Sequence, residues 1–474
     1  MESTHLLQHE DSEANDITIP FKTKAIKNEF IYLLTSAIPI MLSMLIHFSI
    51  PIVNIYSVSQ YGPIQVSAVA LSSVIATTTG NSISLGMATA LDTLCSQAFT
   101  GANSKHQVGI HLQRGIVIQM IMSIPIYLLW WNAKPILMFL RQDPELIELS
   151  AQFLRILILG SPPYIFFECL KKYLQAQKIM RAQTWVLIIA VPITLFVNYM
   201  LMWNPATKVG FLGAPLTVVV GNWLMFSLTL GYIFFIEGKE CWGGWSKECL
   251  TNWKPYLKLG ASGVLMLCSE WWAWSILSLT ISYLGPNPLA AHYIALNIDA
   301  IVYAFPLGVG IATSNRIGNL LGARQINRAK LASLCSFYLG IAISCFNSTI
   351  LGVFRKQISL IFAKEEKLNS ILITLIPMIC IYHVFGSIAY CGSGILRGQG
   401  KQKIGAIINI VSWYYFAIPI GMFMAFYLDY GLQGIWMGIC IALFGTGSSL
   451  AYICLRSDWK SLILEAKVRV EVPE

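Results

Sequence analysis

Charged residues are scarce in this chain. Asp, Glu, Lys and Arg together make up 12% of its 474 residues, whereas 56% are hydrophobic. Soluble domains carry about 25% charged residues. A soluble protein of this length would not cover its water-exposed surface with so few charges. The composition therefore excludes an ordinary soluble domain, and it equally excludes a collagen, a disordered tail and a small disulfide scaffold.

The chain also lacks the motifs of enzymes and of metal or disulfide sites. Its eleven cysteines form no CxxC pair, and most lie inside apolar stretches, where cysteine serves as a small hydrophobic residue. No GxSxG or HExxH occurs, and the segment 400–402 lacks the first glycine and the Ser or Thr of a phosphate-binding loop. The histidines share no metal-ligand spacing. We expect no enzyme activity, no metal and no cofactor.

What the chain has instead is long apolar stretches bounded by polar residues. Twelve of them approach or exceed about 18 residues, the length that crosses a bilayer as a helix. Backbone groups in lipid find no water, so such stretches must form helices or a closed barrel, and the strict alternation of barrel strands is absent. The sequence therefore predicts an all-α membrane protein. The expected spans are 30–53, 65–91, 108–131, 149–169, 185–203, 211–236, 257–284, 289–311, 331–354, 371–391, 404–427 and 432–455.

Loop charges predict how the chain is oriented. An even number of spans places both termini on one side, and roughly three quarters of the Lys and Arg residues lie there, which marks that side as cytoplasmic. This bias accounts for the net charge of +9 without a nucleic-acid partner. Residues 1–29 lack the short apolar segment of a secretory signal peptide. We expect residues 1–29 and 456–474 to form cytoplasmic tails.

Two copies of a six-helix unit follow each other in the sequence. The segment 90–101 aligns with 312–323 at an offset of 222 residues, and three other short segments match in the same order. Because six is even, both copies enter the membrane from the same side. We predict two lobes, 30–236 and 256–455, related by a pseudo-two-fold axis along the membrane normal and joined by a cytoplasmic linker at 237–255. Parallel repeats of this kind serve alternating access in transporters.

Few ionisable residues fall inside the predicted spans. Glu270 lies midway along the seventh span and Asp299 lies within the eighth. A charged side chain at the bilayer centre costs at least about 2.5–3.5 kcal/mol, so such residues mark ion or substrate pathways. Protons and cations compete for one carboxylate, which is a physical basis for exchange; a structural hydrogen bond is the alternative role. Asp92 and Glu168 fall near the cytoplasmic ends of their spans, where we expect them to reach water.

Aromatic residues flank the two acids. Trp271 and Trp272 follow Glu270, and Tyr303 follows Asp299 by one helical turn. Aromatic faces beside a carboxylate suit large, flat organic cations through stacking and cation–π contact. The alternative is that these rings pack against other helices or face lipid. His383 also lies within a span, where a structural hydrogen bond is a stronger interpretation than a proton-carrying role.

Four segments, taken together, resemble the multidrug and toxic compound extrusion (MATE) family in its eukaryotic form. They are 90–99, 270–273, 306–323 and 394–406, and they are distributed over nearly the whole chain. The resemblance implies two six-helix lobes and the efflux of organic cations or other drugs against an inward gradient of protons or Na⁺. It also implies that Glu270 matches the family's seventh-span glutamate, and Asn198 its fifth-span asparagine.

The chain departs from the family at three acidic positions. The tenth-span acid falls on Gly386, with His383 one turn away, and an eighth-span acid of some animal members falls on Asn297, two residues before Asp299. Ser275 stands in place of a second acid in the seventh span. The candidate proton-coupling residues are Glu270 and Asp299. The candidate substrate-binding residues are Trp271, Trp272, Asn198, Asn297, Tyr303 and His383.

These observations together predict a proton-coupled exporter whose two lobes alternate access to the two sides of a membrane. Na⁺-coupled export and the flipping of a lipid-linked molecule are the alternatives within transport. A multispanning enzyme or receptor would need a catalytic constellation or a large external domain, and the predicted external loops are short. The expected partners are a small organic substrate, often cationic, a coupling ion and the bilayer. We expect a monomer in the plasma membrane or the vacuolar membrane.

Overall fold

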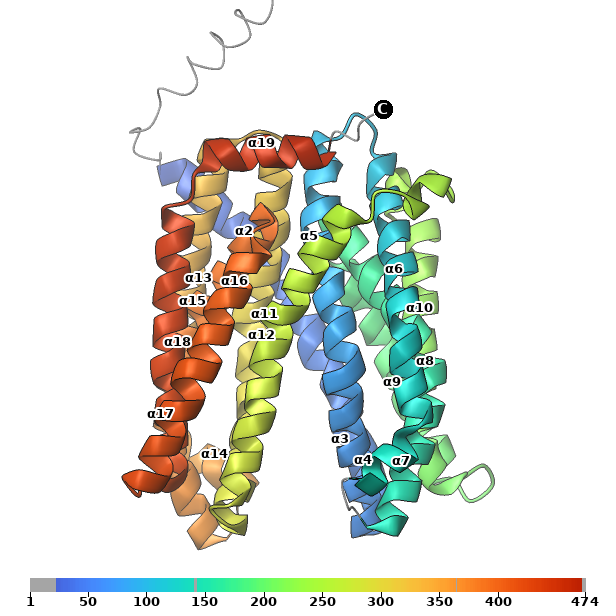
Figure 1. Ribbon diagram of the computed structural model, residues 1–474, viewed down its shortest axis with the longest axis vertical. Helices are drawn as coiled ribbons and strands as arrows, with labels where there is room; N and C mark the ends of the chain where they lie inside the picture. Colours follow the sequence, from blue (N-terminus) through green and yellow to red (C-terminus); the bar gives the residue numbers. More distant parts are fainter. Residues whose placement is uncertain (1–22, 140–142, 364, 471–474) are drawn as a thin grey trace, which may run out of the picture.

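The computed structural model describes residues 23–139, 143–363 and 365–470, and most of them are helical. Twelve helical segments are long and apolar enough to cross a membrane, which confirms the predicted all-α class (Figure 1). The spans are Thr23–Ser59, Pro63–Gly101, His106–Trp131, Pro144–Ala176, Ala182–Met202, Gly210–Phe235, Lys254–Ser282, Pro286–Gly322, Ile326–Val353, Glu366–Gln399, Gln402–Tyr427 and Gly431–Leu455.

Four spans are built from more than one helical segment. The first combines α2 and α3, the second joins α4 to α5 through a π-helical turn, and the eleventh contains α16, α17 and two π-helical segments. The sixth begins with a 3₁₀ turn, Gly210–Leu212, that leads into α10. The short helices α7, α14 and α19 complete the fold. The bounds are α2 (Thr23–His47), α3 (Ser49–Ser59), α4 (Pro63–Ala76), α5 (Ser82–Gly101), α6 (His106–Trp131), α7 (Ala133–Phe139), α8 (Pro144–Ala176), α9 (Ala182–Met202), α10 (Gly213–Phe235), α11 (Lys254–Ser282), α12 (Pro286–Gly322), α13 (Ile326–Val353), α14 (Arg355–Phe362), α15 (Glu366–Gln399), α16 (Gln402–Ile410), α17 (Ile418–Met422), α18 (Gly431–Leu455) and α19 (Trp459–Val470).

The spans form two lobes, α2–α10 and α11–α18. The ribbons of the lobes approach each other at the end of the bundle where α19 lies and separate toward the other end (Figure 1). We call these the α19 end and the opposite end. Two helices of the N-terminal lobe also pack against the other lobe: α2 contacts α12 and α13 as well as α9, and α5 contacts α11, α12 and α15. Arg316 of α12 donates to both carboxylate oxygens of Glu29 on α2, at 2.5 and 2.7 Å.

Glycines set the closest helix crossings. A Cβ atom on Gly394 of α15 would lie 2.1 Å from the carbonyl oxygen of Gly310 on α12. Likewise, a Cβ atom on Gly86 of α5 would lie 2.5 Å from the Cα of Val264 on α11. Small residues let membrane helices approach until their backbones touch. The first crossing fixes two helices within the C-terminal lobe, and the second joins the lobes.

The predicted tails need correction. The expected N-terminal tail 1–29 ends too late, because α2 begins at Thr23; residues 1–22 lie outside the described part of the chain. The expected C-terminal tail contains α19, whose Trp459, Leu462 and Ala466 are buried. Its last residues, 471–474, are also outside the described part. Apolar side chains every three or four residues make this short helix amphipathic, which explains why it packs on the bundle.

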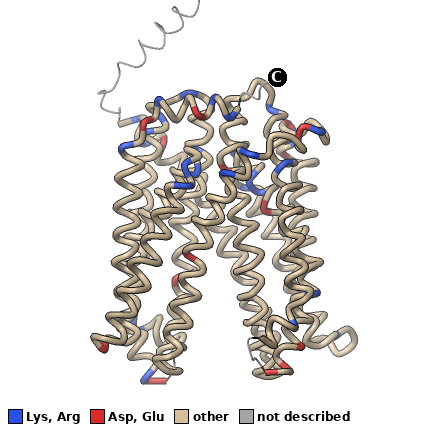
Figure 2. The backbone as a smooth tube through the Cα atoms, viewed as in Figure 1, with Lys and Arg blue, Asp and Glu red and all other residues tan. Residues whose placement is uncertain are grey.

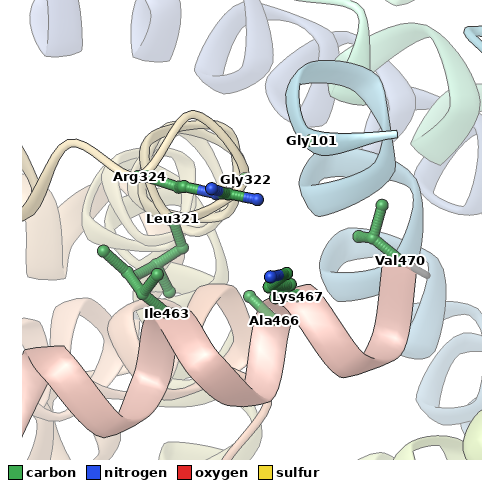
Figure 3. Close-up of a pocket in the computed structure, with 8 residues that line it drawn as sticks. All are labelled: Gly101, Leu321, Gly322, Arg324, Ile463, Ala466, Lys467 and Val470. Atoms are coloured by element: carbon green, nitrogen blue, oxygen red, sulfur yellow. The ribbon is translucent and has the colours of Figure 1, made fainter. Parts of the chain in front are cut away.

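Helix α19 lies across the ends of helices from both lobes. In Figure 3, residues of α19 face the end of α5 at Gly101 and the end of α12 at Leu321 and Gly322. Arg469 donates to the Gln97 side chain of the N-terminal lobe at 3.4 Å and to the Gln399 carbonyl of the C-terminal lobe at 3.1 Å. The α19 end is also where Lys and Arg residues gather (Figure 2).

The predicted linker 237–255 forms two short 3₁₀ helices, Lys239–Cys241 and Lys247–Leu250, which pack against α6 at the α19 end. Polar side chains of α6 hold it in place. Gln113 donates to the Gly244 carbonyl at 2.7 Å, and Arg114 donates to the Thr251 carbonyl at 2.9 Å. The connection between the lobes is therefore bound to the N-terminal lobe along its length.

Candidate functional site

Two tyrosines connect the two candidate acids of the C-terminal lobe. Glu270 lies near the middle of α11 and accepts a hydrogen bond from the Tyr390 hydroxyl at 2.8 Å. Asp299 of α12 is buried and accepts from the Tyr382 hydroxyl at 3.4 Å. The hydroxyl oxygens of Tyr382 and Tyr390 are themselves 3.4 Å apart. A continuous chain of polar groups thus runs from one carboxyl to the other, far from both ends of the spans.

This chain of groups is suited to hold and move a proton. Each tyrosine hydroxyl both donates and accepts, so a proton arriving at one carboxyl changes the hydrogen bonding at the other. The Tyr303 ring meets the Tyr390 ring edge-on, with centroids 4.8 Å apart, and packs beside the network. The Oδ1 atom of Asp299 has no hydrogen-bond partner among the described residues, although it is buried. That acceptor is free to receive a proton or a cation.

The spacing of these two tyrosines in the sequence is a signal that could identify them. Tyr382, Gly386 and Tyr390 are spaced by four residues and share one face of α15. Gly386 is the position at which the family resemblance places an acid. A Cβ atom there would lie 3.5 Å from the Tyr390 ring and 3.8 Å from Leu443, which is ordinary van der Waals contact, so a methyl group fits at this position. This face of α15 therefore carries two tyrosines on either side of a glycine.

The three tryptophans after Glu270 divide between different environments. Trp271 is half-buried, and Trp272 is 42% exposed and donates to the Thr78 carbonyl of the N-terminal lobe at 3.3 Å. Trp274 points into the C-terminal lobe. Its ring contacts Tyr382, with centroids 6.0 Å apart, in an aromatic cluster that supports one of the two bridging tyrosines. The other members of this cluster are His292, Trp413 and Trp436.

Three other candidate residues make no hydrogen bond to the acids. Asn198 is buried in the N-terminal lobe and bonds to the side chains of Ser57 and Asn54, which favours a structural role. Asn297 is exposed and donates back to a carbonyl of its own helix at 2.8 Å. His383 is buried, and its Nε2 has no partner among the described residues.

Asp92 and Glu168 do not reach water, contrary to expectation. Asp92 is 0% exposed and Glu168 is 5% exposed. Lys172 pairs with Asp92 at 2.9 Å, and Lys171 pairs with Glu168 at 2.6 Å. The prediction failed because α5 and α8 run on past the expected span ends into the region where the lobes meet. Both carboxylates are therefore buried and paired with lysines, as buried charges generally are.

The sequence repeat shows why only the C-terminal lobe has the acid pair. The offset of 222 residues places Phe48 where the second copy has Glu270, and Glu168 where the second copy has Tyr390. The first copy thus lacks the acid on its first helix. Within the described residues no group of three or more His, Cys, Asp and Glu residues is arranged to hold a metal ion. The carboxyl–tyrosine network is the feature that distinguishes the two halves.

Twelve apolar helices in two lobes, with two acids joined far from the helix ends, define a multi-pass membrane transport protein. The MatE family model matches residues 39–200 and 264–423. Multidrug and toxin extrusion protein 1 of Danio rerio is 33% identical over 94% of this chain and 75% of its own length. The human protein of the same name is 31% identical over 95% of this chain and 79% of its own length. The chain belongs to the MATE family of transporters.

A solved structure agrees with this assignment. The crystal structure of the eukaryotic MATE transporter AtDTX14 is 25% identical in sequence and superposes with a TM-score of 0.86, covering 94% of this chain and 99% of that one. An uncharacterized transporter of Schizosaccharomyces pombe is 35% identical over 94% of this chain and 82% of its own length. The predicted family and fold are both confirmed.

Proposed function

We propose that this protein exports organic cations in exchange for protons, with Glu270 and Asp299 as the groups that take up and release the proton. The observation that carries the proposal is the hydrogen-bonded network joining these carboxyls through Tyr390 and Tyr382. A bound cation requires an ionised carboxylate, whereas a proton neutralises it. Because both ligands use the same oxygen atoms, binding of one expels the other.

The substrate class follows from what surrounds the acids. Trp271, Trp272 and Tyr303 lie near them in sequence or in space and offer aromatic faces to a flat cation. The relatives named as multidrug and toxin extrusion proteins support export of this kind. The network and its aromatic neighbours suit an aromatic cation better than a small aliphatic one.

Alternating access follows from the two lobes. They are in contact at the α19 end and separate toward the opposite end, an arrangement that suits a state open on the opposite side (Figure 1). We assign the α19 end to the cytoplasm because Lys and Arg gather there (Figure 2). Protons then enter from the opposite side, outside the cell or inside a vacuole, and the cation leaves there. We take the monomer as the functional unit.

A panel of ion gradients in reconstituted vesicles tests this proposal. The purified protein is placed in liposomes, and ethidium, a flat aromatic cation, serves as the probe. We expect a pH gradient to drive ethidium to the acidic side and a Na⁺ gradient of equal size to drive none. Transport driven by Na⁺ alone would support the Na⁺-coupled alternative. If neither gradient moves ethidium but a fluorescent lipid crosses the bilayer, the protein is a flippase and the proposal is wrong.

A further inference from the structure

We propose that Asp92, Lys172 and Arg397 form a charge gate that holds the two lobes together at the α19 end and opens when they separate. The proposal rests on the alternating access proposed above. It assigns a role to three buried charged residues that are not part of the carboxyl–tyrosine network.

The three charges come from both lobes. Asp92 lies on α5 and Lys172 on α8, both in the N-terminal lobe, whereas Arg397 lies on α15 in the C-terminal lobe. All three are less than a tenth exposed. The Asp92 carboxylate is 2.9 Å from the Lys172 ammonium and 4.0 Å from the Arg397 guanidinium. One acid is thus shared between a close cation of its own lobe and a more distant cation of the other lobe.

Neutral hydrogen bonds around this ion pair fix the register of the lobes. Thr93 donates to the Arg397 carbonyl at 2.5 Å, and Gln97 donates to the Gly398 carbonyl at 3.0 Å. In return, Gln402 of the C-terminal lobe donates to the Thr93 hydroxyl at 2.9 Å. Every one of these bonds crosses between the lobes, so none survives if the α19 end opens. These three hydrogen bonds and the ion pair together define a closed state of the α19 end.

The arrangement of partners shows which ionic contact is lost when the lobes separate. When the lobes separate, Asp92 keeps Lys172, so the N-terminal lobe is not left with an unpaired buried carboxylate. Arg397 is the group that loses its counter-charge. Its Nε and Nη2 atoms already have no hydrogen-bond partner among the described residues, although they are buried. A buried cation without close partners gains hydration when water enters. Opening therefore leaves Asp92 paired with Lys172 and exposes Arg397, which lacks hydrogen-bond partners in the closed state, to water.

Among the described residues, neighbouring charges do not supply Arg397 with another partner. Lys171 lies close enough to Lys172 to repel it, and its own charge is paired with Glu168 at 2.6 Å. The three gate residues together carry one excess positive charge. Arg397 is therefore the residue on which a substitution acts most directly, since its removal cancels the excess charge and the only ionic contact of the gate between the lobes.

Hydrogen exchange measured by mass spectrometry on the purified full chain tests the gate. The variants are Arg397→Gln and Arg155→Gln. Arg155 is a matched control because it is half-buried near the opposite end, where it donates to the Trp131 carbonyl of its own lobe at 3.2 Å. Backbone exchange is followed at the α19 end (176–182 and 322–326) and at the opposite end (59–63 and 282–286).

We expect Arg397→Gln to raise exchange at the α19 end about 10-fold and to lower it at the opposite end, because a minor open state becomes populated. Arg155→Gln should change neither end. Arg397→Lys keeps the charge and should give a smaller shift in the same direction, which provides a milder variant if the first folds poorly.

Two results would overturn the gate. The first is no change at either end in Arg397→Gln, and the second is increased exchange at both ends, which indicates general loosening rather than a change of access. The measurement uses neither substrate nor an ion gradient. A negative hydrogen-exchange result would therefore contradict the gate but not proton coupling. A failure of pH-driven ethidium transport would contradict proton coupling but not the gate.

Discussion

We expect the substitution Glu270→Gln to abolish pH-driven ethidium transport. The glutamine amide accepts the hydrogen bond from Tyr390 but takes up no proton at neutral pH, so no charge changes at this position during the cycle. We expect a loss of at least about 100-fold in the initial rate, in line with the effect of removing a positioned proton-transfer group. The rate is measured in liposomes of matched protein content after an acid jump on one side.

The matched control is Glu148→Gln. Glu148 pairs with Lys134 at 2.7 Å on the surface, where both side chains are more than 40% exposed, and such pairs contribute little. It should transport at the wild-type rate. Tyr390→Phe keeps the ring against Tyr303 but removes the hydroxyl, so we expect a partial loss of about 10-fold, the equivalent of one hydrogen bond to a charged group. Undiminished transport by a well-folded Glu270→Gln protein would exclude Glu270 from the mechanism.

The second large effect is expected from a single methyl group. Gly394→Ala places a Cβ atom 2.1 Å from the Gly310 carbonyl oxygen, and a backbone atom of a buried helix cannot move aside as a flexible side chain does. Helices α12 and α15 must separate, at a cost of about 1–3 kcal/mol or more. These helices carry Asp299 and Tyr390. We therefore expect a thermal unfolding midpoint lower by several degrees and a reduced transport rate.

Gly445→Ala provides the control for this substitution. Gly445 lies in α18 of the same lobe, and no atom of the described residues outside its own helix lies within 4 Å of the added Cβ position. The same chemical change should leave the unfolding midpoint unchanged or slightly higher, because alanine is favoured over glycine in a helix by about 0.5–1 kcal/mol. Equal stability of the two variants would show that the α12–α15 crossing tolerates a wider spacing.

Much of the fold could be predicted because lipid imposes strict requirements. A segment without charges and of sufficient length has to be a helix, so twelve spans followed from composition alone. The composition did not predict where the spans end. Helices α5 and α12 continue to Gly101 and Gly322 through polar residues that resemble a loop. Those residues are helical because their side chains bond across to the other lobe, and a contact between distant segments leaves no local pattern in the sequence.

The site was predictable to a similar extent. Glu270 and Asp299 were conspicuous because charge is rare in the spans, and the structure brings them into one network. Tyr382 and Tyr390 were missed because tyrosine is common in this chain, and only their spacing around Gly386 distinguishes them. The family resemblance implies Asn198 as a substrate-binding residue, but Asn198 lies in a polar cluster of the N-terminal lobe. The acids could be identified because charged residues are rare in the spans, whereas their pairing with the tyrosines could be identified only from the three-dimensional packing.

Measurement of proton movement during transport tests the central claim most directly. Liposomes that contain the wild-type protein and a pH-sensitive dye inside are given no initial pH gradient, and ethidium is then added outside. We predict that ethidium entry expels protons and makes the interior alkaline, and that Glu270→Gln liposomes show no such change. Entry of ethidium with the interior pH constant would contradict the exchange of protons for cargo.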